Sequence, residues 1–155
     1  MDYIKNGIVI LSFILSIFAF KKSNDASEKS NKLSEEYNLL VKGQVELQIS
    51  QAIRESRDKV THFIWELEKA ESKDNQNAID LLFSLQESNM NAYEDGCSKY
   101  FDNKIDRSRF KKTYFEEIKN LVENPHLKKK FLDPTTSRYK CILKIYKEWF
   151  DLENS

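Results

Sequence analysis

Residues 33–70 read LSEEYNLLVKGQVELQISQAIRESRDKVTHFIWELEKA. This stretch contains no proline and a single glycine, Gly43, so little in it opposes a helix. Apolar or small residues recur at steps of three and four, as on one face of an α-helix. The stripe consists of Leu33, Tyr37, Val41, Val45, Ile49, Ala52, Ser56, Val60, Phe63, Leu67 and Ala70. The spacing therefore predicts one long amphipathic helix.

The stripe has two interpretations. It can face the core of a helical bundle, or it can pair alongside a copy of itself. Its steps average a little more than 3.6 residues, which indicates a nearly straight helix and not a left-handed heptad seam. The residues expected to carry self-association are Leu33, Tyr37, Val41, Val45 and Ile49.

An apolar segment precedes this helix. Residues 7–20 read GIVILSFILSIFAF, fourteen residues without a charge, and extension back to Tyr3 gives eighteen. A bilayer core needs about 20 helical residues, with about 17 as the lower limit. The segment is long enough if Tyr3 and Lys5 lie at the interface, which suits both side chains. We therefore expect a transmembrane anchor over residues 3–22.

Two alternatives to an anchor have less support from the sequence. A cleaved signal peptide would need a small-residue cleavage site, and only a poor one occurs, at Ala19. A soluble core helix would need a polar face, but residues 7–20 offer only Ser12 and Ser16. Lys21 and Lys22 favour a cytoplasmic location for the C-terminal side. The expectation is a single-pass protein of the cytoplasmic (inner) membrane.

The chain beyond the anchor divides into two parts. Residues 23–32 read SNDASEKSNK and form a polar juxtamembrane segment, either a hinge or a solvated continuation of the helix. Residues 33–155 form the predicted cytoplasmic helical domain. With only 3 Gly and 2 Pro in 155 residues, the chain supplies few of the turns that strands require. We expect an all-α protein: a transmembrane helix, a long amphipathic helix and a small helical bundle.

Further helices follow from local signals. A second helix is expected from Asp74 or Asn75 to a turn at residues 102–103. Asp106 is expected to cap the third helix, with Ile105 and Phe110 packed across the cap. Asn124-Pro125 ends that helix and opens a short one, and a last helix is expected over residues 136–152. The inward positions of the second helix are Ala78, Leu81, Leu82, Leu85, Ala92, Tyr93, Cys97, Tyr100 and Phe101.

Charge is distributed unevenly although the formal net charge is zero. Residues 23–103 carry 9 basic and 16 acidic side chains, whereas residues 104–155 carry 13 basic and 8 acidic ones. The candidate binding residues in the basic half are Lys111, Lys112, Lys128, Lys129 and Lys130. They can contact nucleic acid or anionic lipid headgroups, or they can form a solvated face that balances the acidic half.

One pair of residues suggests catalysis. The spacing from Arg57 to His62 resembles the active-site motif of HEPN-type ribonucleases, which are all-helical domains of similar size. The resemblance implies that both side chains engage the scissile phosphate and the 2′-hydroxyl across a dimer, without a metal. The motif usually lies in a late helix of that family, whereas here it lies early. The alternative is a surface arginine and a half-buried histidine beside Phe63 and Trp65.

Other chemistry finds little support. His62 and Glu66 are spaced to share a metal ion, but no third ligand is in view, so we expect no metal site and no cofactor. Cys97 and Cys141 lie in no metal-binding spacing and are expected to be buried free thiols, with one disulfide as the alternative.

The second half of the chain is similar to an uncharacterised bacterial class of short single-pass membrane proteins with a helical domain of unknown function. The similarity covers about half the chain and implies an architecture, not an activity. It is carried by Leu81, Leu82, Phe83, Tyr93, Glu94, Lys104, Ile105, Asp106, Phe110, Tyr114, Ile118, Tyr139, Leu143, Tyr146, Trp149 and Phe150.

The sequence thus predicts a non-enzymatic, membrane-anchored interaction or scaffold module that self-associates. Its expected partners are membrane lipid and, through the long helix, a second copy or another protein. The alternative is a tethered ribonuclease of a toxin or phage-defence system that uses Arg57 and His62.

Overall fold

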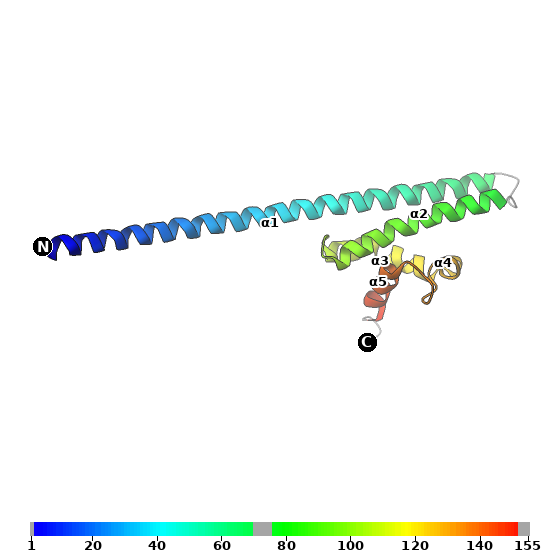
Figure 1. Cartoon of the computed structure of the whole chain (residues 1–155). Coiled ribbons are helices and arrows are strands. Elements are labelled where there is room, and N and C mark those ends of the chain that lie inside the picture. Colours follow the sequence, from blue (N-terminus) through cyan, green and yellow to red (C-terminus); the bar gives the residue numbers. More distant parts are fainter. Residues whose placement is uncertain (1, 70–75, 152–155) are drawn as a thin grey trace. The chain divides into compact units, whose positions relative to one another are not determined.

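The computed structural model describes the backbone of residues 2–69 and 76–151 and the side chains of residues 18–69 and 76–150. Within that part of the chain it contains five α-helices and no strand (Figure 1). They are α1 (Asp2–Lys69), α2 (Gln76–Phe101), α3 (Arg107–Glu123), α4 (Pro125–Lys130) and α5 (Lys140–Asp151). The all-α prediction is confirmed.

The chain forms two units, Met1–Val41 and Lys42–Ser155. The polar segment 23–32 belongs to the first unit and continues α1 as a solvated helix, with Glu28 and Lys32 paired at 2.7 Å. The hinge alternative is therefore wrong. The second unit begins at Lys42, and the predicted domain start at Leu33 stays a prediction.

No helix among residues 18–69 and 76–150 is both long and apolar enough to cross a bilayer. Most of the predicted anchor, residues 3–22, lies outside these residues, and the anchor stays a prediction.

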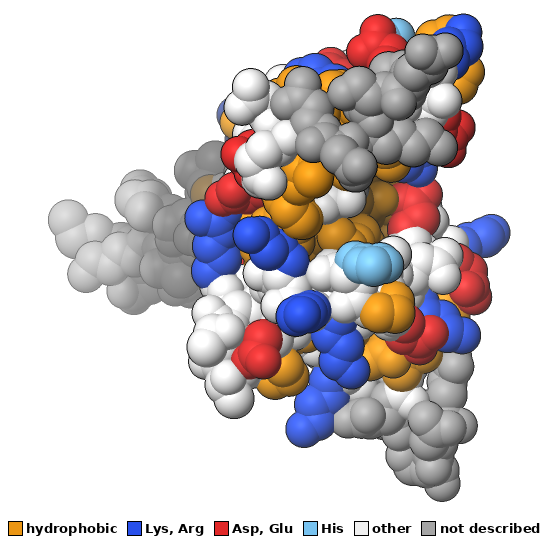
Figure 2. Space-filling view, turned by 90° about the vertical axis from the view of Figure 1, so that its right-hand side faces the viewer, with side chains coloured by type: hydrophobic (Ala, Val, Ile, Leu, Met, Phe, Trp, Pro, Cys, Tyr) orange, Lys and Arg blue, Asp and Glu red, His pale blue; other side chains and the backbone are white. Residues whose placement is uncertain are grey.

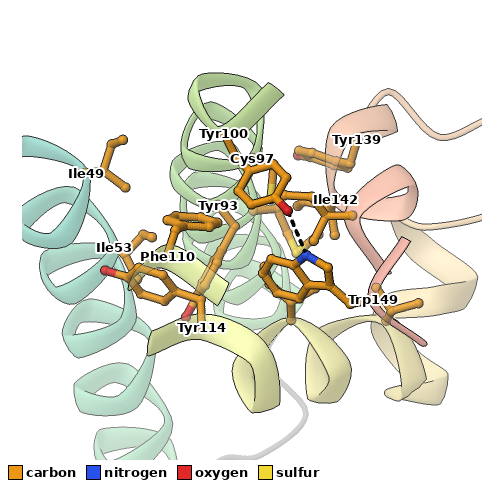
Figure 3. Close-up of a cluster of buried hydrophobic side chains, with 14 of the residues drawn as sticks. Ile49, Ile53, Tyr93, Cys97, Tyr100, Phe110, Tyr114, Tyr139, Ile142 and Trp149 are labelled. Atoms are coloured by element: carbon orange, nitrogen blue, oxygen red, sulfur yellow. Dashed lines mark hydrogen bonds between the residues drawn. The ribbon is translucent and has the colours of Figure 1, made fainter. Parts of the chain in front are cut away.

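The core of the second unit is built from four helices and from the loops before α3 and α5. Figure 3 shows aromatic and aliphatic side chains from α1, α2, α3 and the last helix converging on one cluster. Trp149, Ile142 and Cys97 are at most 1% exposed. The buried apolar members are Ile49, Ile53, Met90, Tyr93, Cys97, Tyr100, Ile105, Phe110, Tyr114, Ile118, Val122, Leu132, Tyr139, Ile142, Ile145 and Trp149.

The face of α1 that enters this core differs slightly from the predicted stripe. Ile49 and Ser56 are buried as expected, but Ile53 is buried in place of Ala52, which is exposed. Leu81, expected to point inward from α2, is 48% exposed. Leu81 belongs to the N-terminal part of α2, whereas the five buried residues of this helix all lie at or after Met90.

Local signals set the ends of α2 and α3. Asp106 Oδ1 accepts a hydrogen bond from Arg109 N at 2.8 Å, so the predicted N-cap is confirmed. Ile105 and Phe110 are both buried around this cap, as a hydrophobic staple requires. At the end of α2, Asn103 adopts a left-handed conformation (φ 55°), and Lys104 N donates to the Lys99 carbonyl at 3.0 Å. This is a Schellman ending with asparagine in the usual glycine position.

The last helix begins later than predicted, at Lys140 instead of Thr136. The carboxylate of Asp133 accepts hydrogen bonds from Thr135 N and Thr136 N, which holds residues 133–136 in a turn. These contacts also lower the pKa of Asp133, the Thr135 side-chain hydrogen bond most of all. Pro125 opens α4 as predicted, and Asn124 Oδ1 accepts from His126 N and Leu127 N. The predicted start of α2 at Asp74 or Asn75 lies outside the described residues.

Gly96 gives a test of how closely the helices pack. A Cβ at this position would lie 3.0 Å from Ile49 Cγ2 and 3.1 Å from the Phe110 ring, whereas a Cβ at Gly43 would meet nothing within 4 Å. Alanine gains about 1 kcal/mol of helix propensity at either site, but overpacking costs about 1–3 kcal/mol.

We therefore expect Gly43→Ala to raise the free energy of unfolding by about 0.5–1 kcal/mol, and Gly96→Ala to lower it by about 1 kcal/mol. Urea denaturation of the two variants measures both effects. Equal stabilisation by the two alanines would contradict the close approach of α2 to α1 and α3.

Candidate functional site

Arg57 lies in a polar contact that joins three helices. Its Nη1 atom is 2.8 Å from Glu117 Oε1, which brings α1 and α3 together. The other oxygen of Glu117 accepts a hydrogen bond from the hydroxyl of Tyr93 on α2. Arg57 and Glu117 are 47% and 35% exposed, while Tyr93 is only 2% exposed. The guanidinium of Arg57 is therefore already paired with a carboxylate, and this ion pair links α1 to α3.

His62 lies elsewhere on α1. Its imidazole is 66% exposed, and Nδ1 is 3.7 Å from Glu66 Oε1. The ring is 6.0 Å from that of Trp65, which also carries Lys69 Nζ 3.3 Å from its centroid. Residues five apart on a helix are about 140° apart around its axis. Arg57 therefore contacts α3, while His62 lies in a shallow solvent-open hollow with Asp58 and Trp65.

The structure thus does not bring the two candidate catalytic side chains to one point within a single chain. Phosphate binding by Arg57 would first require Glu117 to release it. Among the described residues, no group of three or more His, Cys, Asp or Glu is placed to hold a metal ion.

Tyr93 carries a testable pH dependence. Burial, and then the hydrogen bond to the Glu117 carboxylate, raise the pKa of Tyr93 far above its ordinary value. The stability that this shift contributes is fully present below the unfolded pKa of about 10 and is lost as the pH rises beyond it.

Wild type should therefore lose free energy of unfolding above pH 10 more steeply than Tyr93→Phe, by up to about 1.4 kcal/mol per pH unit. Tyr37→Phe is the matched control, because Tyr37 is 67% exposed. Denaturation curves between pH 9 and pH 11.5 measure the slopes. Equal slopes for wild type and Tyr93→Phe would refute the assignment.

Both cysteines are free thiols in the structure, so the disulfide alternative is wrong there. Cys97 is fully buried and Cys141 is half-buried. Burial, followed by the nearby Glu94 carboxylate, raises the pKa of both thiols, and both are consequently poor nucleophiles.

The candidate lysines lie on α3 and α4. Lys112 and Lys128–Lys130 are exposed, and Lys111 lies 5.5 Å from the ring centroid of Phe115. Lys130 lies 4.5 Å from the ring centroid of Phe83. None of the five has a carboxylate within ion-pair distance among the described residues. On the face drawn in Figure 2, Lys and Arg side chains gather in a loose band across the middle, and the Asp and Glu side chains lie mostly toward its margins.

The predicted self-association residues separate into two groups. In the first unit, Leu33 and Tyr37 are each 67% exposed and Val41 is 38% exposed. In the second unit, Ile49 is 4% exposed, and Val45 is partly buried where it packs against the core. The helical spacing of these residues does not show which of them are exposed and which are buried.

Three exposed leucines of α1 lie outside the predicted stripe, and they are Leu39 (70% exposed), Leu40 and Leu47. Leu40 is 72% exposed and Leu47 is 59% exposed. Both follow Leu33 at seven-residue intervals, and this spacing was the signal that could have identified them. We call Leu33, Tyr37 and Leu40, all in the first unit, the apolar face of α1.

A second hollow, of about 300 Å³, lies between α1 and α3 of the second unit. Its walls include Gly43, Leu47 and Phe110. Glu46 at its edge already accepts hydrogen bonds from Asp106 N at 2.7 Å and from Arg109 Nη1 at 2.9 Å. This carboxylate therefore stabilises the start of α3.

No protein-family model matches this chain, and no curated protein or solved structure matches it either.

Proposed function

We propose that this protein is a membrane-anchored, self-associating interaction module of a bacterial cell and that it has no catalytic activity of its own. The observation that carries the proposal is the solvent-exposed apolar face of α1, at Leu33, Tyr37 and Leu40. Contiguous apolar side chains held in water are costly, and they mark contact surfaces. The face follows a segment whose composition suits a bilayer.

The anchor is residues 3–22, and Lys21 and Lys22 keep the following domain in the cytoplasm. Wild type should stay in the membrane pellet during alkaline carbonate extraction. Ile10→Lys combined with Ile14→Lys should release the protein, since each central lysine costs about 2.5–3.5 kcal/mol of insertion. The same two charges at exposed Ile79 and Leu81 serve as the control. Release of wild type into the supernatant would rule out the anchor.

Self-association is tested separately. Fluorescently labelled full-length chains, reconstituted at low density in bilayers, should bleach in more than one step per spot. A population of single-step spots at every protein density would sink the proposal.

The ribonuclease alternative has one favourable observation, the open position of His62 beside Asp58 and Trp65. It predicts that expression of wild type slows growth and cleaves RNA, and that His62→Ala abolishes both effects. That result would replace the interaction-module proposal. Unchanged RNA with both proteins would remove the nuclease from consideration.

A further inference from the structure

We infer that one side of α3 binds single-stranded nucleic acid, with phosphates on its lysines and a base on its aromatic ring. We call this side, made of Lys111, Lys112, Phe115 and Lys119, the α3 basic surface. Residues three, four and seven positions apart share one side of a helix, and all four belong to the second unit. The inference goes beyond the proposed function, because it depends neither on the anchor nor on self-association.

The first support is that the fold does not use these positive charges. Elsewhere in the second unit, Arg57 pairs with Glu117 at 2.8 Å and Arg109 pairs with Glu46 at 2.9 Å. The three lysines of the α3 basic surface have no carboxylate within ion-pair distance among residues 18–69 and 76–150. Their charges are therefore available to an anion from outside the chain.

The glutamates of α3 explain why its lysines stay unneutralised. Glu117 is engaged by side chains of α1 and α2, and Glu123 accepts a hydrogen bond from the Tyr146 hydroxyl at 2.9 Å. Glu116 is the third glutamate of α3, and within the described part of the chain it forms no ion pair with a lysine. Two of the three carboxylates thus hold other helices, which leaves this side of α3 positively charged.

The second support is an aromatic ring among the lysines. Phe115 is partly exposed, and its ring lies nearly parallel to that of buried Trp149 (22°) at a centroid distance of 6.0 Å. The Phe150 ring is 4.5 Å away. Lys111 Nζ lies 5.5 Å from the centroid of Phe115, and Lys119 Nζ lies 5.7 Å from that of Phe150. Phe115 is therefore a fixed surface ring with ammonium groups on either side.

Single-stranded nucleic acid suits this combination better than other polyanions do. Proteins bind such strands by stacking bases on aromatic side chains while basic side chains follow the phosphates. Lys111 and Lys119 lie about 12 Å apart along the helix axis, with Phe115 between them. Phosphates before and after a stacked base can each meet an ammonium group. A lipid headgroup offers the phosphate but no base to stack.

Fluorescence anisotropy of the full chain in non-ionic detergent micelles tests this inference. The probes are fluorescein-labelled oligothymidylate of about 20 nucleotides, enough to cover one binding site, and an abasic oligomer with the same number of phosphates. Oligothymidylate should bind at least about fivefold more tightly, because only its bases can stack on Phe115. Phe115→Leu, which keeps an apolar side chain against Trp149, should bind the two oligomers equally.

Salt dependence tests the lysines. The logarithm of the binding constant should fall with the logarithm of salt concentration at a slope of about −2, since each of three phosphate contacts contributes about −0.7. Lys111→Gln combined with Lys119→Gln should reduce the slope to about −0.7. Arg54→Gln combined with Lys59→Gln removes the same charge from exposed positions of α1 and should leave the slope unchanged. Circular dichroism checks that each variant keeps its helix content.

Three results would overturn the inference. One is the absence of binding to oligothymidylate by wild type. Another is equal binding of the two oligomers by wild type, which would indicate a surface for any polyanion, including an anionic bilayer. The third is equal slopes for the two double variants, which would place the phosphate contacts away from α3.

Discussion

Replacement of Trp149 by alanine should lower the free energy of unfolding by about 3–5 kcal/mol, the usual range for a large buried aromatic side chain. Trp149 is 1% exposed, and its ring stacks on Phe115 at a centroid distance of 6.0 Å. Its indole nitrogen donates to the Tyr100 hydroxyl at 3.3 Å (Figure 3). Trp149→Ala therefore removes contacts of α5 with both α2, at Tyr100, and α3, at Phe115.

Trp65→Ala is the matched control, because the same atoms are removed from a side chain that is 52% exposed. Thermal unfolding followed by circular dichroism should show a Tm lower by more than about 10 °C for Trp149→Ala, and little change for Trp65→Ala. Similar shifts for both variants would contradict the placement of Trp149 at the centre of the core.

The second large effect is expected at Glu94, a residue of α2 that caps another helix. Its two oxygens accept hydrogen bonds from Cys141 N and Ile142 N, each at 2.9 Å. These amides belong to the first turn of α5, where no residue of the helix itself can accept them. The residue before α5 is Tyr139, whose buried side chain is no N-cap acceptor. The Glu94 carboxylate takes that role and also suits the positive end of the helix dipole.

Glu94→Ala should therefore lower the free energy of unfolding by about 2–3 kcal/mol, since two amides lose a charged acceptor. Glu94→Gln should fall between wild type and alanine, because the amide keeps one acceptor oxygen. The control is Glu87→Ala on the same helix, which breaks an exposed ion pair with Arg138 and should cost under about 1 kcal/mol. Chemical denaturation measures the free energy of unfolding of the three variants. Equal decreases for Glu94→Ala and Glu87→Ala would contradict the role of Glu94 as the cap of α5.

Features that depend on neighbouring residues could be predicted from the sequence. Asp106 caps the helix that begins one residue later, and Pro125 opens its own short helix. Both follow from backbone chemistry within one turn, so composition and spacing were sufficient. The start of α5 could not be predicted this way. Its cap, Glu94, lies about 47 residues earlier in the chain.

The candidate site shows the same limit. Arg57 and His62 were singled out by spacing, but the partner that engages Arg57 is Glu117, 60 residues away. Apolar residues of α1 also look alike in the sequence. Ile49 is buried and Leu47 is exposed because the other helices of the second unit cover only one side of α1. Which side is covered depends on packing across the whole second unit. The sequence shows the spacing of the leucines, but it does not show that their side chains are exposed.

The central claim is that the apolar face of α1 is where copies of this protein meet. Two adjacent leucines allow a direct test, because Leu39 and Leu40 are 70% and 72% exposed and point to different sides of the helix. The measurement is the association equilibrium of full-length Leu39→Gln and Leu40→Gln in detergent micelles, by analytical ultracentrifugation. We predict that Leu39→Gln associates like wild type and that Leu40→Gln associates at least several-fold more weakly. Equal association of the two variants, or a wild type that stays monomeric, would contradict the account.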